Sequence, residues 1–103
     1  METLAIHTRL KQDRIAEYER VHAVIPAGLD AALRLAGVMQ YKIWRSGQDL
    51  FHWVQVEDVA AMRVSLANAP ADRHWQELIN SLLEPVVGGD ELPLVWELPA
   101  TAP

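Results

Sequence analysis

The chain begins with a strand-like alternation and then changes to a helical period. In LAIHTRL, residues 4–10, every second side chain faces the same way, with Leu4, Ile6 and Thr8 on one face. This period of two is typical of a β-strand. From Gln12 onward the sheet-facing positions recur at steps of three and four residues, which predicts one face of a helix. These positions are Ile15, Tyr18, His22, Ile25, Leu29 and Leu33.

Pro26 interrupts this helical pattern. A proline inside a helix removes a backbone donor and costs roughly 3 kcal/mol. We therefore predict two helical pieces with a kink or break over residues 24–27. Gly37 is a natural end for the second piece, since glycine readily adopts the left-handed conformation found after helix C-termini.

The second half of the chain predicts a hairpin, two helices and a last strand. Residues 38–45 and 49–57 are rich in aromatic and β-branched residues and flank a polar stretch with a glycine, which predicts a β-hairpin. Asp58 can cap a helix that runs to about residue 68, and Pro70 suits the first turn of the next helix. LPLVWEL, residues 92–98, is predicted to be a strand, followed by a frayed tail over 99–103.

The order β-α-β-β-α-β predicts a ferredoxin-like α+β sandwich, with a four-stranded antiparallel sheet and helices on one face. The 103 residues suit a single domain over residues 1–103. The other sheet face is left uncovered, and Trp44, Trp53 and Trp96 all lie on predicted strands. Such a face needs a partner, so we expect a homodimer of the dimeric α/β barrel kind, packed sheet against sheet.

Composition and charge exclude several classes of protein. Half of the residues are hydrophobic and the net charge is −5, with basic residues scattered along the chain; we therefore expect no nucleic-acid partner. The absence of cysteine excludes disulfides and thiolate metal sites. No signal peptide is visible, and no apolar run reaches the roughly 20 residues that span a membrane. We expect no membrane association and a cytoplasmic location.

The candidate chemistry lies on the first helix and the second strand. Tyr18 and His22 are four residues apart, so they are neighbours on the face expected to turn toward the sheet. They are either hydrogen-bonded core residues or part of a cleft in which His22 acts as acid or base. Tyr41, central in the second strand, is packing or a third polar group. Trp75 is a core residue or a platform for a sugar, and the adjacent His74 points in another direction.

Other kinds of catalytic site lack support in the sequence. The four histidines have no helical ligand spacing with a nearby carboxylate and form no HxH pair, so no metal is expected. There is no glycine elbow for a nucleophilic serine and no glycine loop for a phosphate. The residue pattern alone therefore predicts an α+β dimer with a candidate polar cleft.

Four segments in order resemble the L-rhamnose mutarotase family. They are EYERVH at 17–22, QYKIW at 40–44, DLFHWVQVE at 49–57 and RHWQEL at 73–78. The family pattern has Glu-Tyr-x-x-x-His in the first helix, Asn-Tyr-x-Ile in the second strand and Arg-Trp-Trp in the last helix. The resemblance covers nearly the whole chain. It implies a ferredoxin-like fold, dimers with exchanged strands, and interconversion of the α and β anomers of L-rhamnose without a cofactor.

The resemblance also implies roles for individual residues. The acid/base histidine of the family falls on His22, its two tyrosines fall on Tyr18 and Tyr41, and the second tryptophan of its pair falls on Trp75. The implied roles are protonation of the ring oxygen by His22, binding of sugar hydroxyls by the tyrosines, and stacking of Trp75 on the sugar. His74 stands where the family has the first tryptophan, and we expect it to contact substrate there.

One departure concerns the sugar pocket. The Ile-Trp-Pro-Glu of the family is Ile25-Pro26-Ala27-Gly28 here, so an aromatic ring and a carboxylate are missing. L-Fucose, another 6-deoxy-L-hexose, is therefore a rival substrate. Two alternatives use the same scaffold: a dimeric α/β barrel oxygenase, with haem or without a cofactor, and a non-catalytic protein that binds a small ligand. Haem absorbance tests the first alternative, and anomer exchange tests the second.

Overall fold

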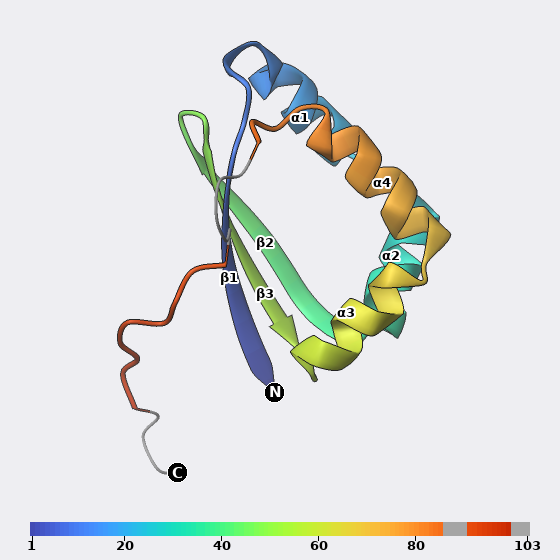
Figure 1. Cartoon of the computed structure of the whole chain (residues 1–103), viewed down its shortest axis with the longest axis vertical. Helices are drawn as coiled ribbons and strands as arrows, with labels where there is room; N and C mark the ends of the chain where they lie inside the picture. Colours follow the sequence, from blue (N-terminus) through green and yellow to red (C-terminus); the bar gives the residue numbers. More distant parts are fainter. Residues whose placement is uncertain (86–90, 100–103) are drawn as a thin grey trace.

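The computed structural model describes residues 1–85 and 91–99 as an antiparallel sheet with helices on one face (Figure 1). The strands are β1 (Glu2–Arg9), β2 (Val38–Ser46) and β3 (Asp49–Val56), in the order β1-β3-β2. The helical elements are the 3-10 turn η1 (Gln12–Arg14) and the helices α1 (Ile15–His22), α2 (Ala27–Leu35), α3 (Val59–Ala67) and α4 (Pro70–Asn80). The predicted α+β class and the helices on one face are confirmed.

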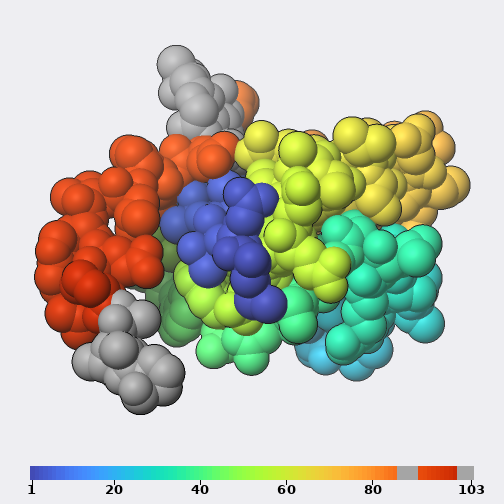
Figure 2. All heavy atoms as spheres, turned by 90° about the horizontal axis from the view of Figure 1, so that it is seen from below, coloured from blue at the N-terminus to red at the C-terminus, as the bar shows by residue number. Residues whose placement is uncertain are grey.

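The prediction of a fourth strand over residues 92–98 is wrong for this structure, whose described residues form a three-stranded sheet. An isolated bridge joins Ile6 to Glu91, and the Leu92 N–H donates to the Ala5 carbonyl at 2.8 Å. No regular ladder with β1 follows this pair in the described residues. The following residues run on the side of the sheet away from α2 and α4 (Figures 1 and 2). Of the predicted frayed tail, residues 100–103 lie outside the described part.

The predicted break at Pro26 is confirmed. α1 ends at His22, and α2 begins directly after Pro26, whose φ of −56° suits a helix start and whose carbonyl accepts from the Leu29 N–H at 3.0 Å. Gly37 follows α2 with a φ of 91°, a conformation that L side chains rarely adopt. The break lets α1 and α2 meet the sheet at different places.

The hairpin and the two later helices are confirmed as well. β2 and β3 pair antiparallel around Gly47, whose φ is 60°. Asp58 caps α3 by accepting a hydrogen bond from the Ala61 N–H at 3.0 Å. Pro70 occupies the first turn of α4, where its missing N–H leaves no helical bond unmade.

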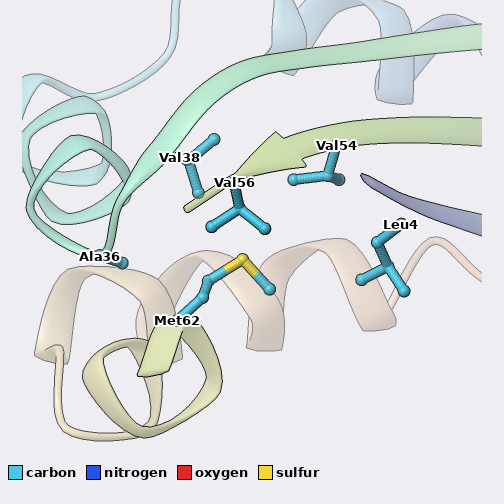
Figure 3. Packing of buried hydrophobic residues seen from close by; sticks show 6 residues of the cluster. All are labelled: Leu4, Ala36, Val38, Val54, Val56 and Met62. Carbon is cyan, nitrogen blue, oxygen red and sulfur yellow. The ribbon is translucent and has the colours of Figure 1, made fainter. Parts of the chain in front are cut away.

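The core consists of two hydrophobic clusters on the helix-facing side of the sheet. The first packs the sheet against α3 and contains Leu4, Ala36, Val38, Val54, Val56 and Met62 (Figure 3). The second packs the other end of the sheet against α1 and α4 and contains Leu10, Tyr18, Leu50, Ile79 and Leu82. Buried positions on β3 alternate, so Leu50, Val54 and Val56 all face the helices.

None of the helices in residues 1–85 and 91–99 covers the opposite face of the sheet (Figure 1). Trp44 and Phe51 are 56% and 40% exposed there, and the Lys42 ammonium lies 5.4 Å from the centre of the Trp53 ring. His7 contacts Asp49 on this face at 2.8 Å, and this hydrogen bond lowers the pKa of the Asp49 carboxyl. The C-terminal residues Leu94, Val95 and Trp96 are also exposed. The protein therefore presents an apolar surface on the side of the sheet without helices.

Candidate functional site

A cavity of about 460 Å³ lies between the sheet and helices α1, α2 and α4. This volume is within the range of small-molecule sites. Much of its wall is aliphatic, formed by Ile6, Ile25, Leu29, Leu33, Ile79 and Leu83. Polar groups from all three strands and from two helices converge on it, which is the arrangement of a site that orients a small polar ligand.

His22, at the end of α1, presents one ring nitrogen for acid/base chemistry. Its Nδ1 lies 2.8 Å from the Tyr18 main-chain oxygen, and since a carbonyl only accepts, Nδ1 carries the proton. Nε2 is then the nitrogen that gains or loses a proton. The imidazole packs between Tyr18, at 4.1 Å between ring centres, and the edge of Trp75, at 5.1 Å. His22 lines the cavity with both of these rings.

Tyr18 is a buried phenol, 4% exposed, with its ring in the second core cluster. Burial raises the pKa of the Tyr18 hydroxyl, and the neighbouring Tyr41 raises it further, because a second negative charge there is unfavourable. Tyr18 is therefore a neutral hydrogen-bonding group throughout the ordinary pH range. Core residue and cavity residue are both correct descriptions of this side chain.

Tyr41 reaches the cavity from β2 and meets His52 of β3. The Tyr41 hydroxyl lies 3.0 Å from Nδ1 of His52, and Nε2 of His52 lies 2.9 Å from the Thr8 hydroxyl on β1. Strand register explains the contact, because Ile6 and Ile43 flank His52 on the two neighbouring strands and place Thr8 and Tyr41 at its diagonals. All three polar side chains line the cavity.

The predicted residues of α4 do not share one location. Trp75 is half-buried and lines the cavity, whereas His74 is exposed and is absent from the cavity wall. Each helical residue advances the direction by about 100°, and on α4 this step turns His74 away from the cavity that Trp75 lines. The structure thus brings Tyr18, His22, Tyr41 and Trp75 together and leaves His74 on the outer side of α4.

Besides Gln76 and Asn80, the polar cavity residues that were not singled out from the sequence are Thr8, His52 and Asp72. A signal existed for each of the last three. Thr8 and His52 occupy inward positions of the strand alternation, among Leu4, Leu50 and other buried neighbours. Asp72 lies three residues before Trp75, which is helical spacing for one face. A polar residue at an inward position is the pattern that would have found all three.

Asp72 carries a prediction for stability. Burial raises the pKa of its carboxyl above the ordinary value of about 3.9, although a hydrogen bond with Gln76 opposes this. The ionised carboxylate is therefore less favourable in the folded than in the unfolded state. This lowers the free energy of unfolding by its full amount at pH values above the folded-state pKa, and the effect vanishes below the unfolded-state pKa. Asp72→Asn is expected to raise the urea midpoint of unfolding at pH 7, with a smaller gain at pH 4. An equal gain at both pH values would contradict this explanation.

A smaller hollow of about 260 Å³ shares Tyr18, His22 and Ile43 with the cavity. Glu19 and Arg45 contribute to its wall and form an ion pair at 3.3 Å. Among residues 1–85 and 91–99, no group of three or more potential metal ligands gathers. None of the described helices is both long and apolar enough to cross a membrane.

The fold and the cavity define a class of small ferredoxin-like α+β proteins. Their site lies between sheet and helices, and here a few polar side chains project from a largely aliphatic wall. Within this class, residues 3–98 match the family described as L-rhamnose mutarotase, so the chain belongs to the L-rhamnose mutarotase family. Membership implies an isomerase-type enzyme acting on a sugar. No curated protein matches the chain significantly.

Solved structures support the same fold. An L-rhamnose mutarotase from Formosa agariphila is similar with a TM-score of 0.77 and 21% identity, over 96% of this chain and all of the other. The tetracenomycin F2 cyclase of Streptomyces glaucescens has a TM-score of 0.71 and 15% identity over 98% of this chain and all of its own. A putative antibiotic biosynthesis monooxygenase from Nitrosomonas europaea has a TM-score of 0.65 and 10% identity, over 93% of this chain and all of its own. At these identities the likeness concerns the fold alone.

Proposed function

We propose that this chain is a mutarotase that interconverts the α and β anomers of a 6-deoxy-L-hexose, L-rhamnose or L-fucose, without a cofactor. The observation that carries the proposal is the position of His22. Its Nδ1–H is engaged by the Tyr18 carbonyl, and its ring lines one cavity with Tyr18, Tyr41 and Trp75. Family membership supports the reaction class.

Mutarotation needs an acid at the ring oxygen and a base at the anomeric hydroxyl. In our proposal Nε2 of His22 gives its proton to the ring oxygen O5 as the C1–O5 bond breaks. The open-chain aldehyde rotates about the C1–C2 bond, and the ring closes on the other carbonyl face with return of the proton to His22. A histidine suits this exchange because its ordinary pKa of about 6.5 lies near working pH.

The other cavity groups are proposed to hold the sugar. The Tyr18 and Tyr41 hydroxyls bind sugar hydroxyls, and Trp75 packs on the apolar face of the ring. The aliphatic wall over α2, which includes Leu29 and Leu33, suits the methyl group at C6 of a deoxy sugar. An aliphatic wall discriminates against an added hydroxyl, because burial without a hydrogen-bond partner is costly.

A panel of sugars tests the substrate class. L-Mannose is the matched control for L-rhamnose, because it differs only by a hydroxyl on C6. We expect anomer exchange, measured by saturation-difference NMR, to be faster with L-rhamnose or L-fucose than with L-mannose at equal concentration. Equal rates for L-rhamnose and L-mannose would contradict the assignment of the aliphatic wall. Binding of all three without faster exchange would indicate a ligand-binding protein.

We also propose that the chain forms a homodimer through the uncovered sheet face. The exposed Trp44 and Phe51 on this face and the exposed Trp96 in the C-terminal segment support this. Light scattering on the purified chain is expected to give the mass of two copies at micromolar concentration. A mass of one copy would contradict the proposal.

A further inference from the structure

His52 is a half-buried histidine at a position where its strand neighbours are aliphatic. Leu50 and Val54 lie on the same side of β3 and are almost fully buried. Both ring nitrogens of His52 have polar neighbours, the Thr8 hydroxyl at 2.9 Å from Nε2 and the Tyr41 hydroxyl at 3.0 Å from Nδ1. The mechanism proposed above gives His52 no role. Its two cross-strand hydrogen bonds at an inward position indicate that His52 has a role in the site.

A proton transfer from Tyr41 to His52 requires one direction for these two hydrogen bonds. A hydroxyl both donates and accepts, so each tautomer of His52 fits the two contacts. In the tautomer that serves proton transfer, the phenol of Tyr41 donates to Nδ1, and the Nε2–H donates to the Thr8 oxygen. Thr8 supports this tautomer, in which Nδ1 can receive a proton through Tyr41.

We propose that Tyr41, His52 and Thr8 form a proton relay that removes the proton of the anomeric hydroxyl during ring opening. This inference rests on the proposed mutarotase function and adds the base that works opposite His22. Tyr41 contacts the sugar, while His52 and Thr8 act through it as positioning residues. The class of substrate is a reducing sugar whose anomeric hydroxyl reaches the Tyr41 oxygen.

The step balances in protons and electrons. The O1–H bond breaks and its proton passes to the Tyr41 oxygen, while the Tyr41 proton passes to Nδ1 of His52. The C1=O1 double bond forms, and the C1–O5 bond breaks with its electron pair going to O5, which takes the proton of His22 Nε2. His52 becomes an imidazolium and His22 a neutral imidazole. Closure of the ring after rotation returns both protons, and no redox partner is needed.

The positions of the groups favour Tyr41 over Tyr18 as the base. His22 approaches the cavity from α1, and the relay approaches it from the strands, so acid and base come from opposite walls. Within residues 1–85 and 91–99, no hydrogen bond joins the Tyr18 hydroxyl to a histidine, and burial raises the pKa of this hydroxyl. A base must accept a proton during the reaction. Of the two cavity tyrosines, Tyr41 is the one whose hydroxyl contacts an imidazole nitrogen in the described part of the chain, and this nitrogen can hold the proton.

Two substitutions at position 52 distinguish proton transfer through His52 from a purely structural role of this side chain. His52→Ala is expected to lower kcat about 10²-fold, the lower range of a general base contribution, with little change in KM. Added imidazole is expected to restore part of the activity, after subtraction of the rate without protein. His52→Asn keeps an acceptor near Nδ1, but its amide cannot take up a proton, so KM should be normal and kcat should remain low.

Thr8 offers a matched pair that changes little in shape. Thr8→Ser keeps the hydroxyl and is expected to keep wild-type kcat, whereas Thr8→Val removes it and is expected to lower kcat about tenfold, roughly what loss of one hydrogen bond gives. Both variants retain β1 and test the relay even if His52→Ala is poorly folded. His7→Gln, on the opposite face of the sheet, controls for loss of a histidine and should leave activity unchanged.

The outcomes distinguish the relay from the function. Full kcat in His52→Asn, or in both His52→Ala and Thr8→Val, would overturn the relay while loss of activity in His22→Ala kept the mutarotase function. Absence of faster anomer exchange in the wild-type protein would overturn both. Low kcat in His52→Asn together with imidazole rescue of His52→Ala would support the relay.

Discussion

Replacing His22 with alanine is expected to lower the enzymatic rate of anomer exchange by about 10²- to 10⁴-fold, the contribution of a positioned acid or base. The Nδ1–H of His22 is fixed by the Tyr18 carbonyl, its ring lines the cavity, and we propose that Nε2 exchanges the proton with the sugar. Without it, O5 must be protonated by water. The rate is measured by saturation-difference NMR between the two anomeric protons at equal protein concentration.

The control for this loss of rate shows that the fold and the sugar-binding cavity of the variant are intact. His22 is only partly buried, so His22→Ala should retain the wild-type circular dichroism and still bind the sugar. His22→Gln is a second variant, which fills more of the space but supplies no titratable proton, and it should be as slow as His22→Ala. Wild-type exchange in either variant would show that His22 is a core residue without a catalytic role.

Replacing Leu50 with alanine is expected to lower the free energy of unfolding by about 2–5 kcal/mol. Leu50 is fully buried on β3 and packs in the cluster that joins Leu10 and Tyr18 to α4. Truncation removes apolar burial and leaves a void that neighbouring side chains fill only in part. Urea unfolding followed by tryptophan fluorescence measures the change.

The matched control is Leu35→Ala, the same chemical change at a side chain that is 85% exposed at the end of α2. A surface truncation of this kind should change the free energy of unfolding by less than about 0.5 kcal/mol. A loss at Leu50 no larger than the loss at Leu35 would show that the second cluster does not stabilise the fold.

Local signals in the sequence predicted most of the elements correctly. Pro26 and Gly37 act on the backbone directly, through a missing donor and a left-handed conformation, so the helix break and the helix end did not depend on distant contacts. The hairpin around Gly47 and the Asp58 cap have the same local origin. Such features are readable because their physical cause lies within a few residues.

The fourth strand was wrong because strand formation is not a local property. Residues 92–98 have the apolar composition of a strand, but pairing needs a partner edge with matching donors. In the described residues of this segment, only Glu91 and Leu92 pair with β1, and no ladder follows them. Exposed Leu94 and Trp96 agree with a segment whose apolar surface is not covered by its own chain.

The candidate site was predictable in part. Tyr18 and His22 are neighbours because of their spacing on one helix. The residue pattern left Tyr41 and Trp75 as packing or site residues, and the resemblance assigned them roles in the site. His52 and Thr8 meet Tyr41 through the register of three strands, which depends on the relative shift of β1, β2 and β3. The alternation of each strand shows which side a residue faces, but it does not show which residue lies diagonally across.

The most direct test of the central claim is anomer exchange of L-rhamnose and L-fucose by the wild-type protein and by His22→Ala, measured side by side with saturation-difference NMR. We predict that the wild-type protein accelerates exchange of at least one of these sugars well above the buffer rate and that His22→Ala loses about 10²-fold or more of that acceleration. Exchange at the buffer rate with the wild-type protein, or equal acceleration by the two proteins, would contradict the assignment.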